Sequence, residues 1–151
     1  LPAIGGKEGA GRVELLGEGV QGFSAGQLVL LPVGCGTWST HVQAPAAQFV
    51  PLPEGADARQ LAMLAINPPT ALLMLRQFVD LQPGEWVIQN AANSAVGGYL
   101  IELAKLRGLK TVNVVRRDSA IEQMQDAPGD VLLVDGDDLA QRVAEATGKA
   151  K

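Results

Sequence analysis

Two short stretches carry residues whose types and spacing suit the binding of a phosphorylated ligand. The first is a run of small residues, 91–94, which follows the apolar run 86–88 and precedes a helix-like pattern. The second is the pair Arg116-Arg117, which directly follows the β-branched run 111–115. Small residues let backbone N–H groups approach a phosphate, and guanidinium groups pair with phosphate oxygens bidentately. Together the two stretches predict an anion site.

The elements that would position these residues form a βαβ unit across residues 85–118. After the first strand, apolar residues at 96, 100, 103, 104 and 106 have helical spacing, and Gly108 is predicted to end the helix. Such a unit usually carries G-x-G-x-x-G in its first turn and binds a dinucleotide there. Here the turn keeps only the last glycine, Gly97, while Asn93 and Ser94 supply side chains for a phosphate or for capping the helix.

The end of the second strand indicates which dinucleotide binds. Units that bind NAD typically place an acid about 20 residues beyond the glycine turn, where it accepts the ribose 2′-hydroxyl. This chain has Arg116 and Arg117 at that place and Asp118 only afterwards. We therefore predict NADPH as the cofactor. The alternative is that both arginines are ordinary solvated loop residues.

Composition limits the other classes of function. The chain has 151 residues, a net charge of -4 and 47% hydrophobic residues. Mild acidity argues against a nucleic-acid partner or an anionic membrane surface, and there is no apolar run long enough to span a membrane. The single cysteine, Cys35, allows neither an intramolecular disulfide nor a thiolate metal cluster. Because both ends look cut, we expect a part of a longer protein.

Along the chain, the pattern predicts β structure first and an α/β alternation afterwards. Strands are predicted at 12–16, 27–31, 41–44 and 49–53. A helix at 60–66, capped by Asp57, is predicted to be interrupted by Asn67-Pro68-Pro69, with Asn67 extended, and a second helix at 71–81. Beyond the βαβ unit we predict a helix at 119–124, a strand at 131–134 and a helix at 138–146.

Four further features each have two interpretations. Cys35 and His41 could form a nucleophile and base, or be a buried thiol and a surface histidine. Glu8 could line a site or serve the glycine-rich loop around it, and Trp38 could line a substrate pocket or lie in the core. Asp135-Gly136-Asp137-Asp138 lacks the spacing of a calcium loop, so we favour a turn and helix cap.

Six stretches, taken together, match the pattern of one known family. They are 1–9 (Leu-Pro-Ala-Ile-Gly-Gly-Lys-Glu-Gly), 36–38 (Gly-Thr-Trp), 67–71 (Asn-Pro-Pro-Thr-Ala), 82–85 (Gln-Pro-Gly-Glu), 89–97 (Gln-Asn-Ala-Ala-Asn-Ser-Ala-Val-Gly) and 113–116 (Asn-Val-Val-Arg). The chain resembles the medium-chain dehydrogenase/reductase superfamily, closest to its zinc-independent trans-2-enoyl-CoA (2-enoyl thioester) reductase branch, with quinone oxidoreductases as neighbours. The resemblance covers the chain up to about Asp118.

The resemblance implies a set of cofactor contacts. Asn67 and Thr70 correspond to the family's Asn-Pro-x-Thr-Ala motif, and Asn93, Ser94, Ala95 and Val96 to its phosphate loop. Arg116 and Arg117 correspond to its 2′-phosphate cluster, although the family has Arg-Asp-Arg where this chain has Arg-Arg-Asp. We therefore predict that the cofactor-binding residues are Asn67, Thr70, Asn93, Ser94, Ala95, Val96, Gly97, Arg116 and Arg117.

The resemblance also limits metal and catalytic residues. Zinc-using relatives carry Gly-His-Glu where this chain has Gly6-Lys7-Glu8, and their clustered cysteines are missing, so no metal is expected. The family's proton-donating tyrosine lies upstream of Leu-Pro-Ala, so no catalytic residue is assigned here. Tyr99, the only tyrosine in the chain, is not given that role.

The expected fold class is α/β: part of a GroES-like β domain, then the first half of a Rossmann doubly wound parallel sheet. We place the GroES-like part at 1–53, connecting helices at 54–84 and the Rossmann half at 85–151. The implied function is NADPH-dependent reduction of the C=C bond of a 2-enoyl thioester. The alternatives are a quinone or enone oxidoreductase of the same superfamily, or a protein that holds NADPH without turnover. We expect a homodimer and a cytoplasmic location, or a mitochondrial one in a eukaryote.

Overall fold

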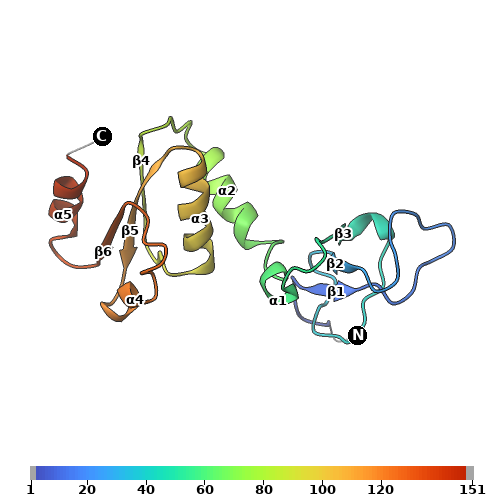
Figure 1. The fold of residues 1–151 in the computed structure, drawn as a ribbon. Helices are drawn as coiled ribbons and strands as arrows, with labels where there is room; N and C mark the ends of the chain where they lie inside the picture. The colour runs from blue at the N-terminus through green and yellow to red at the C-terminus, as the bar shows by residue number, and fades with distance from the viewer. Residues whose placement is uncertain (1–2, 149–151) are drawn as a thin grey trace. The chain divides into compact units, whose positions relative to one another are not determined.

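The computed structural model describes residues 3–148, which divide into two compact units, one ending at Ile66 and the other starting at Asn67 (Figure 1). Leu1 and Pro2, which begin the first family motif, lie outside the described residues, as does the end of the chain after Gly148. The three domain ranges expected from the sequence stay a prediction.

The first unit is built on a small antiparallel sheet with β2 in the centre. Its elements are β1 (Ala10–Arg12), β2 (Leu28–Leu30), η1 (Ala46–Gln48), β3 (Val50–Pro51) and α1 (Ala58–Leu61). Val29 of β2 pairs with Gly11 on one side and Pro51 on the other, and its side chain is 2% exposed. This confirms the β structure predicted at the start of the chain.

The strands of this unit are shorter than predicted. Beyond Arg12, backbone pairing continues only through Val13, which exchanges hydrogen bonds with Gln27 and Gly26, and Leu15 is exposed. The predicted strand at 41–44 does not form. The carbonyl oxygen of His41 accepts a hydrogen bond from the Ser39 hydroxyl at 3.1 Å and belongs to no ladder. Alternation in the sequence could not reveal that these segments lack a neighbouring strand.

Asp57 caps α1 as predicted, but the helix is short. Its carboxylate accepts a hydrogen bond from the backbone N–H of Arg59 at 2.9 Å. That backbone bond, followed by the bond from the Arg59 side chain, lowers the pKa of Asp57. Regular helix ends at Leu61, and turns occupy residues 62–66, so the predicted helix at 60–66 was wrong in extent.

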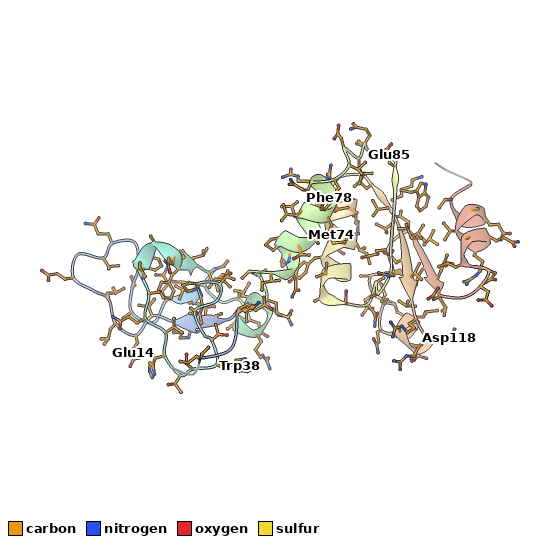
Figure 2. All side chains as sticks on the ribbon, turned by 180° about the vertical axis from the view of Figure 1, so that it is seen from behind. Glu14, Trp38, Met74, Phe78, Glu85 and Asp118 are labelled. Atoms are coloured by element: carbon orange, nitrogen blue, oxygen red, sulfur yellow. The ribbon has the colours of Figure 1, made fainter. Side chains whose placement is uncertain are left out.

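The next helix, α2 (Asn67–Arg76), begins earlier and ends earlier than predicted. Asn67 and both prolines lie in its first turn, so the expected extended conformation of Asn67 was wrong. Proline is tolerated there because the first N–H groups of a helix have no intrahelical acceptor. After the helix ends, Phe78 is 80% exposed instead of packed, and its ring is seen on the outer side of the unit (Figure 2).

The second unit contains a parallel sheet of order β4-β5-β6. Its strands are β4 (Trp86–Gln89), β5 (Lys110–Val115) and β6 (Val131–Val134), and its other helices are α3 (Ala95–Leu106), α4 (Ser119–Glu122) and α5 (Leu139–Ala146). All three strands were predicted from the sequence, and the parallel order confirms the start of a Rossmann fold. In Figure 1, α2 and α3 lie on one side of the strands and α5 on the other.

Two apolar clusters fix the position of α3. On one side Leu100 and Ala104 pack with Leu75 of α2, which is 1% exposed. On another side Ile101 packs with Val115 of β5 and with the buried residues of the segment that includes α4. The Arg107 guanidinium, at the end of α3, donates to the backbone carbonyl oxygen of Leu75 near the end of α2. The helix α3 is therefore held to the unit along its length and at its C-terminal end.

A buried polar network adds a second constraint. The side chain of Asn113 in β5 is 0% exposed, and its amide nitrogen donates to the Thr111 hydroxyl at 3.0 Å and to the Pro128 carbonyl at 2.9 Å. Its oxygen accepts from Gln89 Nε2 at 2.8 Å, and the same nitrogen of Gln89 donates to the Gly97 carbonyl at 3.1 Å. The network thus connects β5, β4 and the first turn of α3.

Asn113→Leu should lower the free energy of unfolding by about 2 kcal/mol, because it removes the acceptor of one Gln89 N–H and the donors to the Thr111 hydroxyl and the Pro128 carbonyl. Urea denaturation followed by circular dichroism measures this. The matched control is Asn90→Leu, at an exposed position, which should change the free energy by less than about 0.5 kcal/mol. Equal effects of the two variants would show that the network contributes nothing to stability.

Candidate functional site

The second unit has a pocket of about 390 Å³ at the carboxyl ends of its strands. Open α/β sheets bind ligands at this edge, because the turns that follow parallel strands meet there. Two segments and two single residues line the pocket: the turn after β4, the end of β5 with the residues that follow it, one residue after α4 and one residue after β6. The lining residues are Asn90, Ala91, Asn93, Val114, Val115, Arg116, Arg117, Ser119, Ala120, Gln123 and Asp135.

The turn after β4 has a fixed and unusual backbone. Ala91 has φ 48°, and within residues 3–148 it is the only residue other than glycine with a positive φ. The N–H of Ser94 donates to the Ala91 carbonyl at 2.9 Å, which closes the turn. A left-handed alanine costs roughly 1 kcal/mol or more, so the surrounding contacts must hold it in place. The turn therefore bends sharply at the floor of the pocket.

Ser94 is the N-cap of α3, which is one of the two roles that the sequence left open for Asn93 and Ser94. Its side-chain oxygen accepts a hydrogen bond from the Gly97 N–H at 3.1 Å. The N–H groups of Ala95 and Val96, the first two residues of the helix, have no intrahelical acceptor. These two N–H groups and the helix dipole make the start of α3 favourable for an anion.

Gly97 is retained for a geometric reason. A Cβ atom at this position would lie 2.3 Å from the backbone carbonyl oxygen of Ala92, far inside van der Waals contact. The first turn of α3 therefore lies directly on the turn that leaves β4. At positions 92 and 94, where the usual fingerprint has glycines, alanine and serine fit the turn, and Ala92 is 1% exposed.

Arg116 and Arg117 give the pocket its positive charge. Both follow β5, both are exposed and both line the pocket. Among the described residues neither forms an ion pair or a side-chain hydrogen bond. Asp118 pairs with neither arginine and does not line the pocket, so the acid that departs from the family pattern leaves both guanidinium charges available. Asp135 is the one carboxylate in the lining.

The structure gathers part of the predicted set at this pocket. Asn93, Arg116 and Arg117 line it, and Ser94, Ala95, Val96 and Gly97 form the adjacent first turn of α3. Asn67 and Thr70 lie in α2, which packs on α3, and are not among the lining residues. The cofactor-binding role of all nine residues stays a prediction.

Four polar residues of the lining were missed by sequence reasoning: Asn90, Ser119, Gln123 and Asp135. Asn90 and Asp135 come directly after strands β4 and β6, and residues at the carboxyl ends of parallel strands share one edge. That rule could have identified both. Gln123 follows the four-residue helix α4, and no spacing rule indicates that it turns toward the pocket.

In the first unit, the candidate residues His41, Trp38 and Glu8 do not come together in an arrangement comparable to the pocket of the second unit. His41 Nε2 lies 2.9 Å from a carboxylate oxygen of Glu14, and both side chains are largely exposed. Trp38 is 83% exposed, and one face of its ring lies against Gly5, where a Cβ atom would be 2.6 Å from it (Figure 2). Trp38 is therefore not a core residue. One carboxylate oxygen of Glu8 is buried without a hydrogen-bond partner among residues 3–148.

The described part of the chain offers neither a metal-binding group nor a membrane-spanning helix. No three or more His, Cys, Asp or Glu side chains come together as a metal-binding group there. No helix in that part is both long and apolar enough to cross a membrane.

Comparisons with known proteins agree with this architecture. The family model of the alcohol dehydrogenase GroES-like domain matches residues 1–54. The mitochondrial enoyl-[acyl-carrier-protein] reductase of Rattus norvegicus is 42% identical over 127 residues, which cover 83% of this chain and 34% of that protein. The chain thus spans about a third of the length of the curated relative.

Two solved structures are similar over nearly the whole chain. A structure of an Etr1p/NADP/crotonyl-CoA complex has a TM-score of 0.83 and 28% identity, covering 95% of this chain and 45% of that one. A structure from Bacillus thuringiensis, named for an NADPH:quinone reductase, has a TM-score of 0.83 and 31% identity, covering 99% and 45%.

Gly97→Ala should lower the free energy of unfolding by about 2 kcal/mol, because the new methyl group overlaps the Ala92 carbonyl. The neighbouring substitution Gly98→Ala is the control. A Cβ atom at position 98 meets nothing within 4 Å, so alanine there should raise stability by about 1 kcal/mol through its higher helix propensity. Urea denaturation of both variants tests the pair; a stabilising Gly97→Ala would contradict the close contact.

Proposed function

We propose that the protein containing this chain is an oxidoreductase. The premise is that the chain belongs to the medium-chain dehydrogenase/reductase superfamily, in its 2-enoyl thioester reductase branch. The protein uses NADPH to reduce the C=C bond of a 2-enoyl thioester. The observation that carries the proposal is the pocket at the carboxyl edge of the sheet, where two arginines without ion-pair partners lie beside the start of α3. Such a pocket suits a dinucleotide that carries an additional phosphate.

The 2′-phosphate and the pyrophosphate of the cofactor each have residues suited to hold them. Arg116 and Arg117 pair with the 2′-phosphate, because guanidinium groups remain charged and bind phosphate oxygens bidentately. The N–H groups of Ala95 and Val96 receive the pyrophosphate at the start of α3. Asn67 and Thr70, at the start of α2, make further contacts with the cofactor, as the family motif implies.

The reduction adds one hydride and one proton across the C=C bond. NADPH, when bound, supplies the hydride, which the family delivers to the β-carbon, and the α-carbon takes the proton. The residues of this chain bind and orient the cofactor. Tyr99, whose ring packs against the apolar cluster between α2 and α3, is not proposed as the proton donor.

A quinone or enone reductase of the same superfamily is the second candidate. The 31% identity to the structure named for an NADPH:quinone reductase favours it, since that protein is as similar in fold as the thioester reductase. Both candidates use the same cofactor pocket and differ in the substrate. A third possibility, binding of NADPH without turnover, would leave the pocket intact and the protein inactive.

We also expect the full-length protein to be a homodimer without nucleic-acid or membrane partners. The rat relative is mitochondrial by name. A cytoplasmic or mitochondrial location for the protein itself stays a prediction.

The deciding experiment measures oxidation of NADPH and of NADH by the full-length protein, with crotonyl-CoA and with a simple quinone as acceptors. Rapid turnover of NADPH with crotonyl-CoA is the expected result. Turnover with the quinone alone would move the protein to the second candidate. NADPH binding without turnover of either acceptor would support the third possibility.

Replacing the arginines should weaken the binding of NADPH more than the binding of NADH. Arg116→Ala and Arg117→Ala should each raise KM for NADPH roughly tenfold, because each variant loses about one charge-assisted hydrogen bond at an exposed site. KM for NADH should change less than about threefold, because NADH has no 2′-phosphate for the arginines to bind.

The matched control for this pair is Asp118→Ala. Because Asp118 pairs with neither arginine and lies outside the pocket lining, its removal should leave both KM values within about threefold. An equal rise of both KM values in the arginine variants would show that Arg116 and Arg117 do not read the 2′-phosphate.

A further inference from the structure

We infer that Gln123 is a further specificity-determining residue, which donates a hydrogen bond to the 2′-phosphorylated ribose of the cofactor and holds Asn93 beside it. This inference rests on the proposed function. Gln123 belongs to neither the phosphate turn nor the arginine pair, and it lies outside the six stretches that carry the family resemblance.

The first argument is the contact that Gln123 makes. The Asn93 amide nitrogen donates to Gln123 Oε1 at 3.3 Å, across a separation of 30 residues in the sequence. Both side chains line the pocket, Asn93 from the turn before α3 and Gln123 from the turn after α4. The contact therefore links two segments that line the same pocket.

The second argument is the hydrogen-bonding capacity that remains. Gln123 uses its oxygen toward Asn93, while its Nε2 group donates to none of the described residues. A primary amide has two N–H donors, and phosphate and ribose oxygens are acceptors. The remaining donors of Gln123 thus complement the same ligand group as the guanidinium groups of Arg116 and Arg117 in the lining.

The third argument is that the segment is anchored. Ala120 and Met124, on either side of Gln123 in the sequence, are 8% and 6% exposed and belong to the apolar cluster with Val115 and Ile101. Gln123 itself is exposed. Its backbone is therefore held by the core while its side chain stays available, so a substitution at 123 changes the pocket without disturbing the packing.

Two substitutions separate contact with the ligand from support of Asn93. Gln123→Glu keeps an oxygen acceptor for Asn93, removes the N–H donors and adds a negative charge beside the phosphate site. Gln123→Met has a similar size and removes both functions without adding charge. The control is Gln141→Met on α5, where the amide donates to Glu145 Oε1 at 2.9 Å and lies outside the pocket lining.

The experiment measures the dissociation constants of the full-length variants for NADPH, NADH and adenosine 2′-monophosphate by isothermal titration calorimetry. Gln123→Glu should raise the dissociation constants for NADPH and adenosine 2′-monophosphate roughly tenfold or more, and Gln123→Met should raise them about three- to tenfold. The dissociation constant for NADH should change less than about threefold in both variants, and the control should match the unmodified protein.

Three outcomes overturn the inference, and they are distinguishable. If the unmodified protein binds NADPH and the Gln123 variants match the Gln141→Met control, Gln123 has no role while the proposed function stands. If the binding of NADPH and that of NADH weaken equally, Gln123 does not recognise the 2′-phosphate. If the unmodified protein binds neither dinucleotide, the proposed function fails and this inference fails with it.

Discussion

The close contact between the first turn of α3 and the carbonyl of Ala92 is the constraint on which the second unit depends. The 2.3 Å that would separate a Cβ atom at position 97 from that carbonyl oxygen leaves no room for a side chain. With the helix seated this closely, the N–H groups of Ala95 and Val96 come beside the turn that leaves β4. The rest of the unit holds α3 there, with apolar packing on two sides and the guanidinium of Arg107 at its far end.

The buried polar network around Asn113 also holds α3 in place, through hydrogen bonds instead of apolar packing. Gln89 Nε2 donates to the Gly97 carbonyl and to Asn113, so the strand that precedes the turn also fixes the helix that follows it. Apolar packing is tolerant of small sliding movements, whereas a buried amide with directional partners is not. We interpret the network as fixing the register of α3 relative to β4 and β5.

The parts of the fold that follow from local pattern were predictable. The strand at 131–134 and the end of α3 before Gly108 depend on neighbouring residues, and the structure has them where the sequence predicted. The conformation of Asn67 differs from the prediction, because here the tolerance of a first helical turn for proline outweighs the preference of a residue before proline for extended backbone.

The parts that depend on tertiary neighbours were not predictable. Phe78 and Val79 continue the apolar spacing of α2, yet the helix ends before them and they are exposed. The predicted strand at 41–44 has the right alternation and no partner strand. In the site, the glycine turn and the arginines follow from spacing along one βαβ unit. Gln123 does not, because its approach to Asn93 depends on how the segment around α4 packs beneath β5.

The lack of ion-pair partners for Arg116 and Arg117 has a consequence for how a ligand arrives. The chain as a whole carries a net charge of -4, so its net charge is weakly repulsive toward a polyanionic ligand. At the carboxyl edge of the sheet the sign is reversed, since two cations stand together with one lining carboxylate, Asp135. Such a local reversal steers a charged ligand toward one place and orients it before contact. Because exposed charges are screened over about 8 Å at physiological ionic strength, the same feature makes the rate of association sensitive to salt.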